Sequence, residues 1–323
     1  MNASEPANTP RRPLVAVTEH LSEEAFEWLE ERFEVLRAAV TDPRFAEAAP
    51  DIDALVVRTY TQVDDGLLAL LPRVKAVGRA GVGIDNIDIA ACRRRGVQVL
   101  STPDANTQAV VEYVLCLLCD ALRPRLFLER PVDTQAWERI RTEVCGERQM
   151  DELTLGILGF GRIGSRVAQV ARAIGFRVLY NDLLTFAPSM RHGAEPVSAE
   201  DLFARSDVIT LHIDGRPDNR RFVNASLIKH MRPQALLLNT CRGFVLDHEA
   251  LADFLRMNPG AQALLDVHEP EPFPADHPLL GMRNAHLAPH LASRTRSAMD
   301  RMSWVVRDAV AVLEGRKPEF AAS

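Results

Sequence analysis

A glycine-rich turn at residues 159–164 limits the fold of this 323-residue chain more than any other feature of its sequence. A short apolar stretch at residues 153–158 leads directly into the turn, and a helical pattern at 165–174 follows it. A second apolar stretch occupies residues 176–180. Strand, turn, helix and strand in this order predict a βαβ unit of a parallel sheet, and a Gly-x-Gly-x-x-Gly pattern is informative only in that context.

The three glycines of this turn have separate physical roles. Gly159 permits a tight turn, Gly161 lets the backbone approach a ligand closely, and Gly164 lets the helix pack on the strand. The N-terminus of the following helix offers free N–H groups and a partial positive charge to phosphate oxygens. We therefore expect the turn to bind the pyrophosphate of a dinucleotide.

The acidic residue after the second strand narrows the choice of dinucleotide. Asp182 follows the turn by roughly 20 residues, where a carboxylate accepts hydrogen bonds from the adenosine ribose hydroxyls. The same carboxylate would repel the additional phosphate of NADP, and no basic residue follows it before Arg191. The sequence therefore predicts NAD rather than NADP.

Composition argues against several other classes of protein. A net charge of −6 and an isoelectric point near 5.9 argue against a nucleic-acid partner, which usually meets a basic surface. No run of about 18 apolar residues predicts a membrane-spanning helix, and the N-terminus lacks the apolar core of a signal peptide. We expect a cytoplasmic protein.

The five cysteines form neither a disulfide framework nor a pattern of metal ligands. Cys116 and Cys119 lie three residues apart within an apolar helical stretch, on one face of the expected helix. We expect both to be buried as small apolar side chains, and we expect no metal site.

Two series of alternating strands and helices organise the chain. In the first series, short apolar runs that predict buried parallel strands occupy residues 14–17, 54–57, 74–77 and 97–100. A long helix over 107–122, closed by Pro124, connects this series to the second, which begins near residue 153. A last helical pattern covers residues 294–314.

In the second series, three apolar runs end in residues that carry chemistry. They lead to Arg242, Glu271 and His290, respectively. Ligands of open α/β sheets bind beyond the carboxyl ends of the strands, so these side chains are expected at one crevice. Each alone would be an ordinary surface or structural residue; their joint occurrence favours catalysis.

Five ordered motifs give the chain a family resemblance between about residues 14 and 315. They occupy residues 78–88, 159–164, 239–243, 266–272 and 289–290. In these motifs the chain resembles the D-isomer-specific 2-hydroxyacid dehydrogenases, a group that includes phosphoglycerate dehydrogenase and glyoxylate/hydroxypyruvate reductase.

The resemblance implies a fold and a catalytic trio. The implied fold is α/β with parallel sheets: a flavodoxin-like substrate domain at 14–104 and 294–323, and a Rossmann NAD-binding domain at 105–293. Residues 1–13 are polar and rich in proline, which predicts a disordered tail. The trio maps onto Arg242, Glu271 and His290. Arg242 would hold the substrate carboxylate, His290 would exchange a proton with the substrate oxygen, and Glu271 would orient the imidazole and favour its charged form.

The resemblance also implies residues that bind the cofactor and the substrate. Beside the glycines and Asp182, the cofactor residues would be Arg162, Ile163, Ile213, Thr240 and Asp266, the last at the nicotinamide end. The substrate carboxylate would be met by Arg58 and by the backbone at Gly81, Val82 and Gly83, since small residues let amide groups approach an anion.

We therefore expect an NAD-dependent D-2-hydroxyacid dehydrogenase that works mainly as a 2-ketoacid reductase. Family resemblance further suggests a homodimer, with residues 123–141 as an arm. An alternative is an NAD(H)-sensing, corepressor-like interaction protein with little turnover. Two residues depart from the family pattern: Asp214 stands where a proline is usual, and Tyr113 where a histidine is common.

Overall fold

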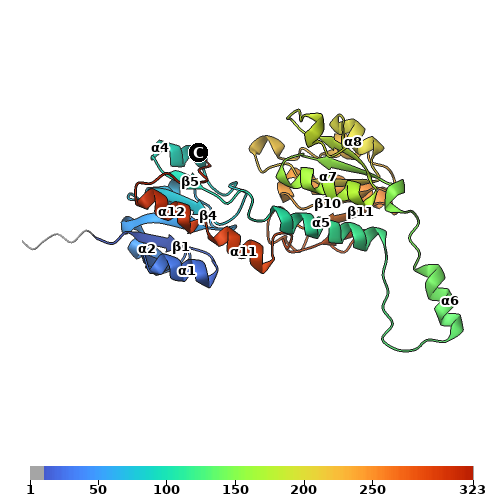
Figure 1. The fold of residues 1–323 in the computed structure, drawn as a ribbon, viewed down its shortest axis with the longest axis horizontal. Coiled ribbons are helices and arrows are strands. Elements are labelled where there is room, and N and C mark those ends of the chain that lie inside the picture. The colour runs from blue at the N-terminus through green and yellow to red at the C-terminus, as the bar shows by residue number, and fades with distance from the viewer. Residues whose placement is uncertain (1–10, 323) are drawn as a thin grey trace, which may run out of the picture. The chain divides into compact units, whose positions relative to one another are not determined.

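The computed structural model describes residues 11–322, so most of the predicted tail lies outside the described residues. The chain divides into two compact units (Figure 1). The first unit contains the described residues up to Asn106 and those from Thr295 onwards, and the second unit is Thr107–Arg294. Both units are α/β, and both sheets are wholly parallel, which confirms the predicted fold class.

The first unit is built on a five-stranded sheet of order β2-β1-β3-β4-β5. Its strands are β1 (Leu14–Val17), β2 (Glu34–Arg37), β3 (Ile52–Val57), β4 (Ala76–Arg79) and β5 (Gln98–Leu100). Its helices are α1 (Glu23–Glu30), α2 (Pro43–Ala48), α3 (Asp65–Ala69), α4 (Ile89–Arg94), α11 (Arg296–Ser303) and α12 (Val306–Leu313), with a 3-10 turn at Ala49–Asp51. All six residues of β3 are buried, as expected for a central strand covered on both faces.

Side chains at alternate positions of these strands pack into two separate apolar cores. One core includes Ala16 and Leu55 and is covered by α2, α3 and α4. The other includes Val15 and Val56 and is covered by α1 and α12. Successive side chains of a strand point to opposite faces, which is why neighbouring residues enter different cores. The C-terminal segment thus completes the core of the first unit.

The helical pattern over residues 294–314 forms two helices rather than one. The chain forms α11 and α12, separated at Trp304 and Val305. At this break Val305 is buried in the core, while the Trp304 ring meets Trp28 of α1 edge-on at 5.9 Å. Periodicity alone did not reveal the break, because both halves retain helical spacing.

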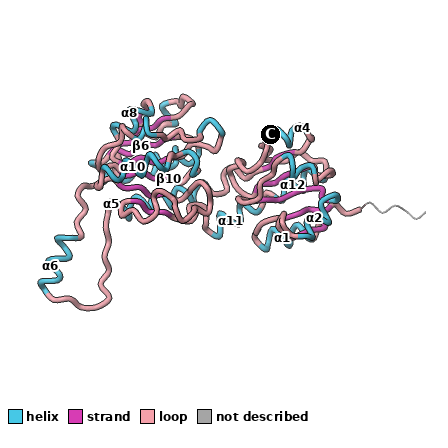
Figure 2. The backbone as a smooth tube through the Cα atoms, turned by 180° about the vertical axis from the view of Figure 1, so that it is seen from behind, coloured by secondary structure: helices cyan, strands magenta, loops and turns pink. Residues whose placement is uncertain are grey.

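The second unit is built on a seven-stranded sheet of order β12-β11-β10-β9-β6-β7-β8. Two of its strands, β6 and β10, are labelled in Figure 2. Its strands are β6 (Thr154–Leu158), β7 (Arg177–Asn181), β8 (Glu195–Pro196), β9 (Val208–Leu211), β10 (Leu236–Asn239), β11 (Gln262–Leu265) and β12 (Ala285–Leu287). The order reverses between β6 and β9, the topological switch point at which doubly wound folds bind ligands.

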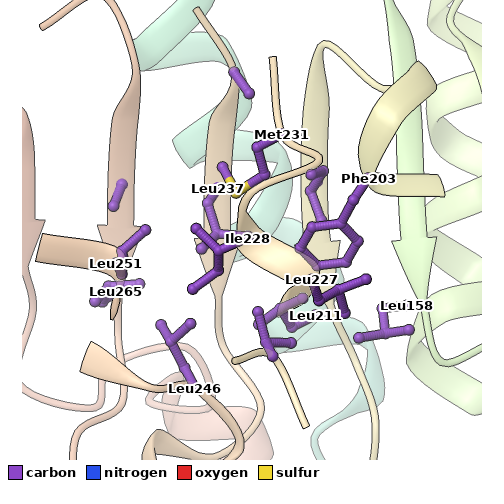
Figure 3. Packing of buried hydrophobic residues seen from close by; sticks show 14 of the residues in the cluster. Leu158, Phe203, Leu211, Leu227, Ile228, Met231, Leu237, Leu246, Leu251 and Leu265 are labelled. Carbon is purple, nitrogen blue, oxygen red and sulfur yellow. The ribbon is translucent and has the colours of Figure 1, made fainter. Parts of the chain in front are cut away.

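Helices cover both faces of this sheet. The helices of this unit are α5 (Thr107–Leu122), α6 (Thr134–Glu143), α7 (Arg162–Ile174), α8 (Ala199–Arg205), α9 (Ala225–Ile228) and α10 (His248–Met257), with 3-10 turns at Met150–Glu152, Pro188–Met190, Pro217–Asn219 and Gly243–Val245. Helix α6 has no buried residue and stands away from the sheet (Figure 1), so the other helices form the cover. One core packs under α5 and α7, and the other packs under α8, α9 and α10. Figure 3 shows the second of these, in which Phe203, Leu211 and Leu237 lie together.

Two local predictions for the second unit need correction. Helix α7 begins at Arg162 rather than Ser165, so the last part of the glycine turn is already helical. Cys116 is exposed and Cys119 only partly buried, against the expectation that both are in the core. Their spacing places them on one face of α5, but the buried face is the one that carries Val110, Val114 and Leu118.

In the described residues, no helix is long and apolar enough to span a membrane.

Candidate active site

The carboxyl ends of three adjacent strands bring the predicted trio to one edge of the second sheet. Strands β10, β11 and β12 are neighbours in parallel register. Arg242 follows the end of β10 by three residues, Glu271 lies on the loop after β11, and His290 follows the end of β12 by three residues. This edge is where a parallel sheet exposes backbone and loop groups to a ligand.

His290 and Glu271 form a direct side-chain pair. Nδ1 of His290 lies 2.8 Å from Oε2 of Glu271, and both side chains are partly buried. A carboxylate only accepts hydrogen bonds, so Nδ1 carries the hydrogen, and Nε2 is the nitrogen left to exchange a proton with another molecule. His290 also has a φ of 55°; a positive φ is uncommon for a residue with a side chain, and His192 and Arg221 have one as well.

Two opposing effects set the ionisation of Glu271. Burial raises the pKa of its carboxyl, but hydrogen bonds from the His290 ring and from the backbone N–H of His268 more than offset this and lower the pKa. The second of these bonds reaches Oε1 at 2.9 Å. Glu271 is therefore a carboxylate at neutral pH, oriented by a hydrogen bond at each oxygen.

Asp266 holds the segment that carries His290. Its carboxylate accepts the N–H groups of Leu291 at 2.7 Å and Ala292 at 2.8 Å, and its carbonyl oxygen accepts the N–H of His290 at 2.9 Å. Burial, first of all, raises the pKa of the Asp266 carboxyl. Burial raises the pKa of the Tyr113 hydroxyl on α5, and the charge of Asp266 raises it further, so the unusual tyrosine lies near the site.

Arg242 stands on a turn that buried Asn239 shapes. The Asn239 side chain donates to the carbonyl oxygen of Arg242 at 2.9 Å and accepts the N–H of Cys241 at 3.1 Å. Nη1 of Arg242 donates to the Cys241 carbonyl at 2.7 Å. Burial raises the pKa of the Cys241 thiol to about 11, so this cysteine stays protonated and unreactive beside the guanidinium.

The glycine turn fits a dinucleotide. A β-carbon on Gly159 would lie 2.6 Å from the His212 carbonyl carbon, and one on Gly164 would lie 2.0 Å from the Gly159 oxygen, so both positions require glycine. A β-carbon on Gly161 would meet nothing within 4 Å, which leaves open space in front of the turn. Helix α7 begins here with no side-chain cap on its first N–H groups. Uncapped N–H groups facing open space suit a pyrophosphate.

The remaining cofactor residues predicted from sequence lie around the same edge. Asp182 follows β7, and its carboxylate accepts the N–H of Phe160 at 2.6 Å and that of Leu184 at 2.8 Å. Ile213 follows β9 on the loop adjacent to Gly159, and Ile163 is partly buried in the first turn of α7. The remaining two are Arg162, which begins α7, and Thr240, which follows β10 and has a buried hydroxyl without a protein partner in the described chain.

Asp214 has a clear structural role despite its unusual position. Its carboxylate binds the guanidinium of Arg216, with Nε at 2.7 Å, and accepts from the Asn219 side chain at 2.9 Å. These bonds lower the pKa of Asp214 and raise that of Arg216, to which the charge of Asp182 also contributes. Asp214, at the position where a proline is usual, thus stabilises the loop after β9. This loop lies beside the predicted adenosine end of the cofactor site.

In the first unit, a carboxylate that sequence reasoning missed organises the loop of Arg58. Glu19 accepts the backbone N–H groups of four successive residues, Arg58, Thr59, Tyr60 and Thr61, at 3.0–3.2 Å. Burial raises its pKa, but these bonds outweigh burial and lower the pKa. The Asn86 side chain closes the same loop by donating to the carbonyls of Arg58 and Thr61. An isolated acid carries no motif, so only the folded backbone reveals it.

The other predicted anion-binding loop follows β4 in the same unit. Gly81, Val82 and Gly83 come directly after Arg79 and Ala80, and the N–H of Gly81 donates to the Arg79 carbonyl at 2.8 Å. Gly81 is buried, whereas Val82 and Gly83 are partly exposed. Among the described residues of the chain, no cluster of three or more histidine, cysteine or acidic side chains could hold a metal ion.

Known proteins are similar to this chain in sequence and in fold. The family model for the NAD-binding domain of D-isomer specific 2-hydroxyacid dehydrogenases matches residues 115–292. The chain is 36% identical over 321 residues to the glyoxylate reductase of Aeropyrum pernix, with 95% of each protein covered. It is 33% identical over 303 residues to the D-3-phosphoglycerate dehydrogenase of Mycobacterium leprae, covering 92% of this chain and 56% of that one.

A solved structure agrees. The glyoxylate reductase from Paecilomyes thermophila superposes with a TM-score of 0.82 at 26% identity, and covers 97% of this chain and 99% of that protein. The fold and the site edge define an NAD-dependent oxidoreductase that acts on a CH–OH group. The chain belongs to the D-isomer specific 2-hydroxyacid dehydrogenase family, as its motifs predicted.

Proposed function

We propose that this enzyme works mainly as a reductase of a small 2-keto acid, with His290 as the proton donor. The observation that carries the proposal is the pair of His290 and Glu271 at the carboxyl edge of the NAD-binding sheet. Nδ1 is committed to Glu271, so Nε2 is the atom that delivers a proton to the carbonyl oxygen or removes one in the reverse direction. The bound nicotinamide supplies the hydride.

The proposed roles of the other residues follow from their chemistry. Arg242 holds the substrate carboxylate and polarises the neighbouring carbonyl, since its planar fork suits a bidentate contact. Arg58 and the backbone of the loop at Gly81, Val82 and Gly83 also meet the carboxylate, and Val82 and Gly83 supply the amide donors because the Gly81 N–H is bonded to the Arg79 carbonyl. Within the first unit, Glu19 and Asn86 hold the loop of Arg58 in place, and the loop of Gly81 is fixed by its position directly after β4.

We propose corresponding roles for the cofactor residues. The turn from Gly159 to Gly164, including Arg162 and Ile163, binds the pyrophosphate, and Asp182 binds the adenosine ribose. Ile213 and Thr240 line the cofactor. Asp266 serves the nicotinamide end indirectly in this proposal, because both of its oxygens hold the segment of His290.

A panel of keto acids tests the proposed function. Purified protein is mixed with NADH or NADPH and with glyoxylate, hydroxypyruvate, pyruvate or 3-phosphohydroxypyruvate, and nicotinamide oxidation is followed by absorbance. We expect NADH-dependent turnover of at least one acid. Binding of NADH without turnover of any of them would instead favour the sensing protein that the sequence left as an alternative.

We further propose that the enzyme is a homodimer whose second unit contributes an arm. Residues 123–141 lie between α5 and β6, and α6 within this segment has no buried residue. Leu126, Phe127, Leu128 and Trp137 are exposed there, with Phe127 at 85%. Exposed apolar side chains in one segment are typical of an interface. Light scattering at micromolar concentration should give the mass of a dimer; a monomer would refute the proposal.

A cytoplasmic location is also proposed, on the basis of the five cysteines. All are free thiols, including exposed Cys116 and Cys145, as expected in a reducing compartment. Fractionation of cells that express the chain should recover it with cytoplasmic markers. Recovery with secreted or membrane fractions would contradict this location.

A further inference from the structure

His268 contacts all three segments that carry the proposed catalytic trio. It lies on the loop after β11 and is 6% exposed. Its backbone N–H donates to Oε1 of Glu271 at 2.9 Å, and Nε2 of its ring lies 2.8 Å from the carbonyl oxygen of Ala288, two residues before His290. Its position in the sequence, outside the trio, indicates only a structural histidine.

The third contact is with the segment of Arg242. A β-carbon on Gly243, the next residue, would lie 2.0 Å from the carbonyl carbon of His268 and 2.5 Å from its Cα. The two backbones therefore touch at a position where only glycine fits. From its own loop after β11, where it contacts Glu271, His268 thus also contacts the loop after β10 and the loop after β12.

The ring contact defines the tautomer of His268. A carbonyl oxygen only accepts hydrogen bonds, so Nε2 carries the hydrogen that bonds to Ala288. The other ring nitrogen, Nδ1, is buried and has no hydrogen-bond partner in residues 11–322. The single N–H bond to Ala288 is thus the polar contact that orients this ring.

Three rings surround the imidazole of His268. Phe273 meets it edge-on at 4.7 Å, His277 at 5.7 Å, and His248 lies at 6.5 Å. Burial lowers the pKa of His248 to about 4 and also lowers that of His277, so both are uncharged at neutral pH. The surroundings of His268 are therefore buried and uncharged, which strengthens its one directed hydrogen bond.

We propose that His268 is a positioning residue of this enzyme. The hydrogen bond from its ring N–H connects the segment that carries His290 to the loop that carries Glu271. The inference rests on the proposed function, because it assumes that these two side chains act on the substrate. His268 itself need not touch the substrate. Catalysis is sensitive to the position of the reacting side chains, since displacing them by about 1 Å can lower the rate by about 100-fold.

Two substitutions separate the hydrogen bond from packing. His268→Phe keeps an aromatic ring in the cluster but removes the donor, whereas His268→Gln keeps a side-chain N–H near the position of Nε2 but loses the ring. We expect His268→Phe to lower kcat by about 10- to 100-fold, with KM and the Kd for NADH changed less than about threefold. His268→Gln should retain most of the wild-type kcat. The reverse order would overturn the inference.

A double-mutant cycle with Glu271→Gln tests how His268 acts. If it works by aligning the Glu271–His290 pair, His268→Phe should cost much less kcat in the Glu271→Gln background than in wild type. Equal costs in both backgrounds would show an unrelated structural effect and would refute the inference. The substrate is whichever of glyoxylate, hydroxypyruvate, pyruvate and 3-phosphohydroxypyruvate the wild type reduces with NADH.

Folding and the proposed function are tested separately. Thermal melting and NADH binding verify that each variant is folded. If His268→Phe does not fold, His268→Gln decides: a folded Gln variant that loses more than about tenfold in kcat overturns the inference. Absence of turnover by the wild type would defeat the proposed function itself, whereas an active wild type and an equally active His268→Phe would defeat only the positioning role.

Discussion

Nδ1 of His290 lies 2.8 Å from Oε2 of Glu271, on loops that follow the two strands at one end of the sheet in the second unit. The pair gives the imidazole one orientation and leaves Nε2 for the substrate. The pair also connects the loop after β11 with the loop after β12. Glu271 accepts the backbone N–H of His268, and the backbone N–H of His290 donates to the carbonyl oxygen of Asp266.

Removing the charge of Glu271 should impair the chemical step. Glu271→Gln keeps the shape but loses the carboxylate that stabilises the imidazolium form, and we expect kcat for keto-acid reduction to fall by about 100-fold. Glu269→Gln is the matched control, since its exposed carboxylate pairs with Arg220 instead. Steady-state kinetics measure both, and a Glu271→Gln enzyme with wild-type kcat would contradict the proposed role.

Two glycines of the turn should respond differently to alanine. A methyl group on Gly164 collides with the Gly159 oxygen, so Gly164→Ala should lower the free energy of unfolding by about 1–3 kcal/mol. Gly161→Ala meets no protein atom and should fold normally, but should weaken NADH binding about tenfold because the methyl group occupies the proposed phosphate space. Urea unfolding and fluorescence titration test both, and unaltered NADH affinity in Gly161→Ala would count against that assignment.

The charge of Asp182 should determine the preference for NADH over NADPH. Asp182→Asn keeps an oxygen to accept the Phe160 N–H but removes the charge that repels a phosphate. We expect the ratio of kcat/KM for NADPH to that for NADH to rise by about tenfold or more, equivalent to about 1.4 kcal/mol of lost repulsion. Glu200→Gln, at an exposed position of α8, separates this effect from a general loss of charge. An unchanged ratio in Asp182→Asn would refute the assignment.

Glu19 should stabilise the first unit in a pH-dependent way. Its folded-state pKa is lowered from the ordinary 4.5, so its stabilisation is complete above that value and is lost as the pH falls through the lower folded-state pKa. Glu19→Gln should therefore lower the free energy of unfolding by about 1–3 kcal/mol at pH 7 and by less at pH 3. Glu24→Gln, an exposed site on α1, is the control. A destabilisation that grows on acidification would contradict this prediction.

Sequence reasoning recovered the fold class because its signals are local. The apolar strands, the glycine turn and the polar strand ends each lie within a few residues, and parallel sheets bring successive strand ends to one edge. That rule alone is sufficient to expect Arg242, Glu271 and His290 at the same edge. It does not give the 2.8 Å contact between two of them, which depends on how two loops close.

The missed features depend on contacts between distant residues. Glu19 lies about 40 positions from the loop it organises, and the ring of His268 meets a carbonyl 20 positions away. The exposure of Cys116 was missed for a related reason: helical spacing tells which residues share a face, but not which face another element covers. Asp214 gained an explanation only when Arg216 and Asn219 were seen around it.

The most direct test of the central claim is the rate of keto-acid reduction by His290→Ala, beside wild type and His286→Ala. His286 is an exposed histidine on β12 and serves as the matched control. With NADH and the best keto acid of the panel, kcat of His290→Ala should fall by about 10²- to 10⁴-fold while the Kd for NADH stays within about twofold, and His286→Ala should match wild type. A folded His290→Ala enzyme that retains kcat within about threefold of wild type would show that the proton comes from elsewhere.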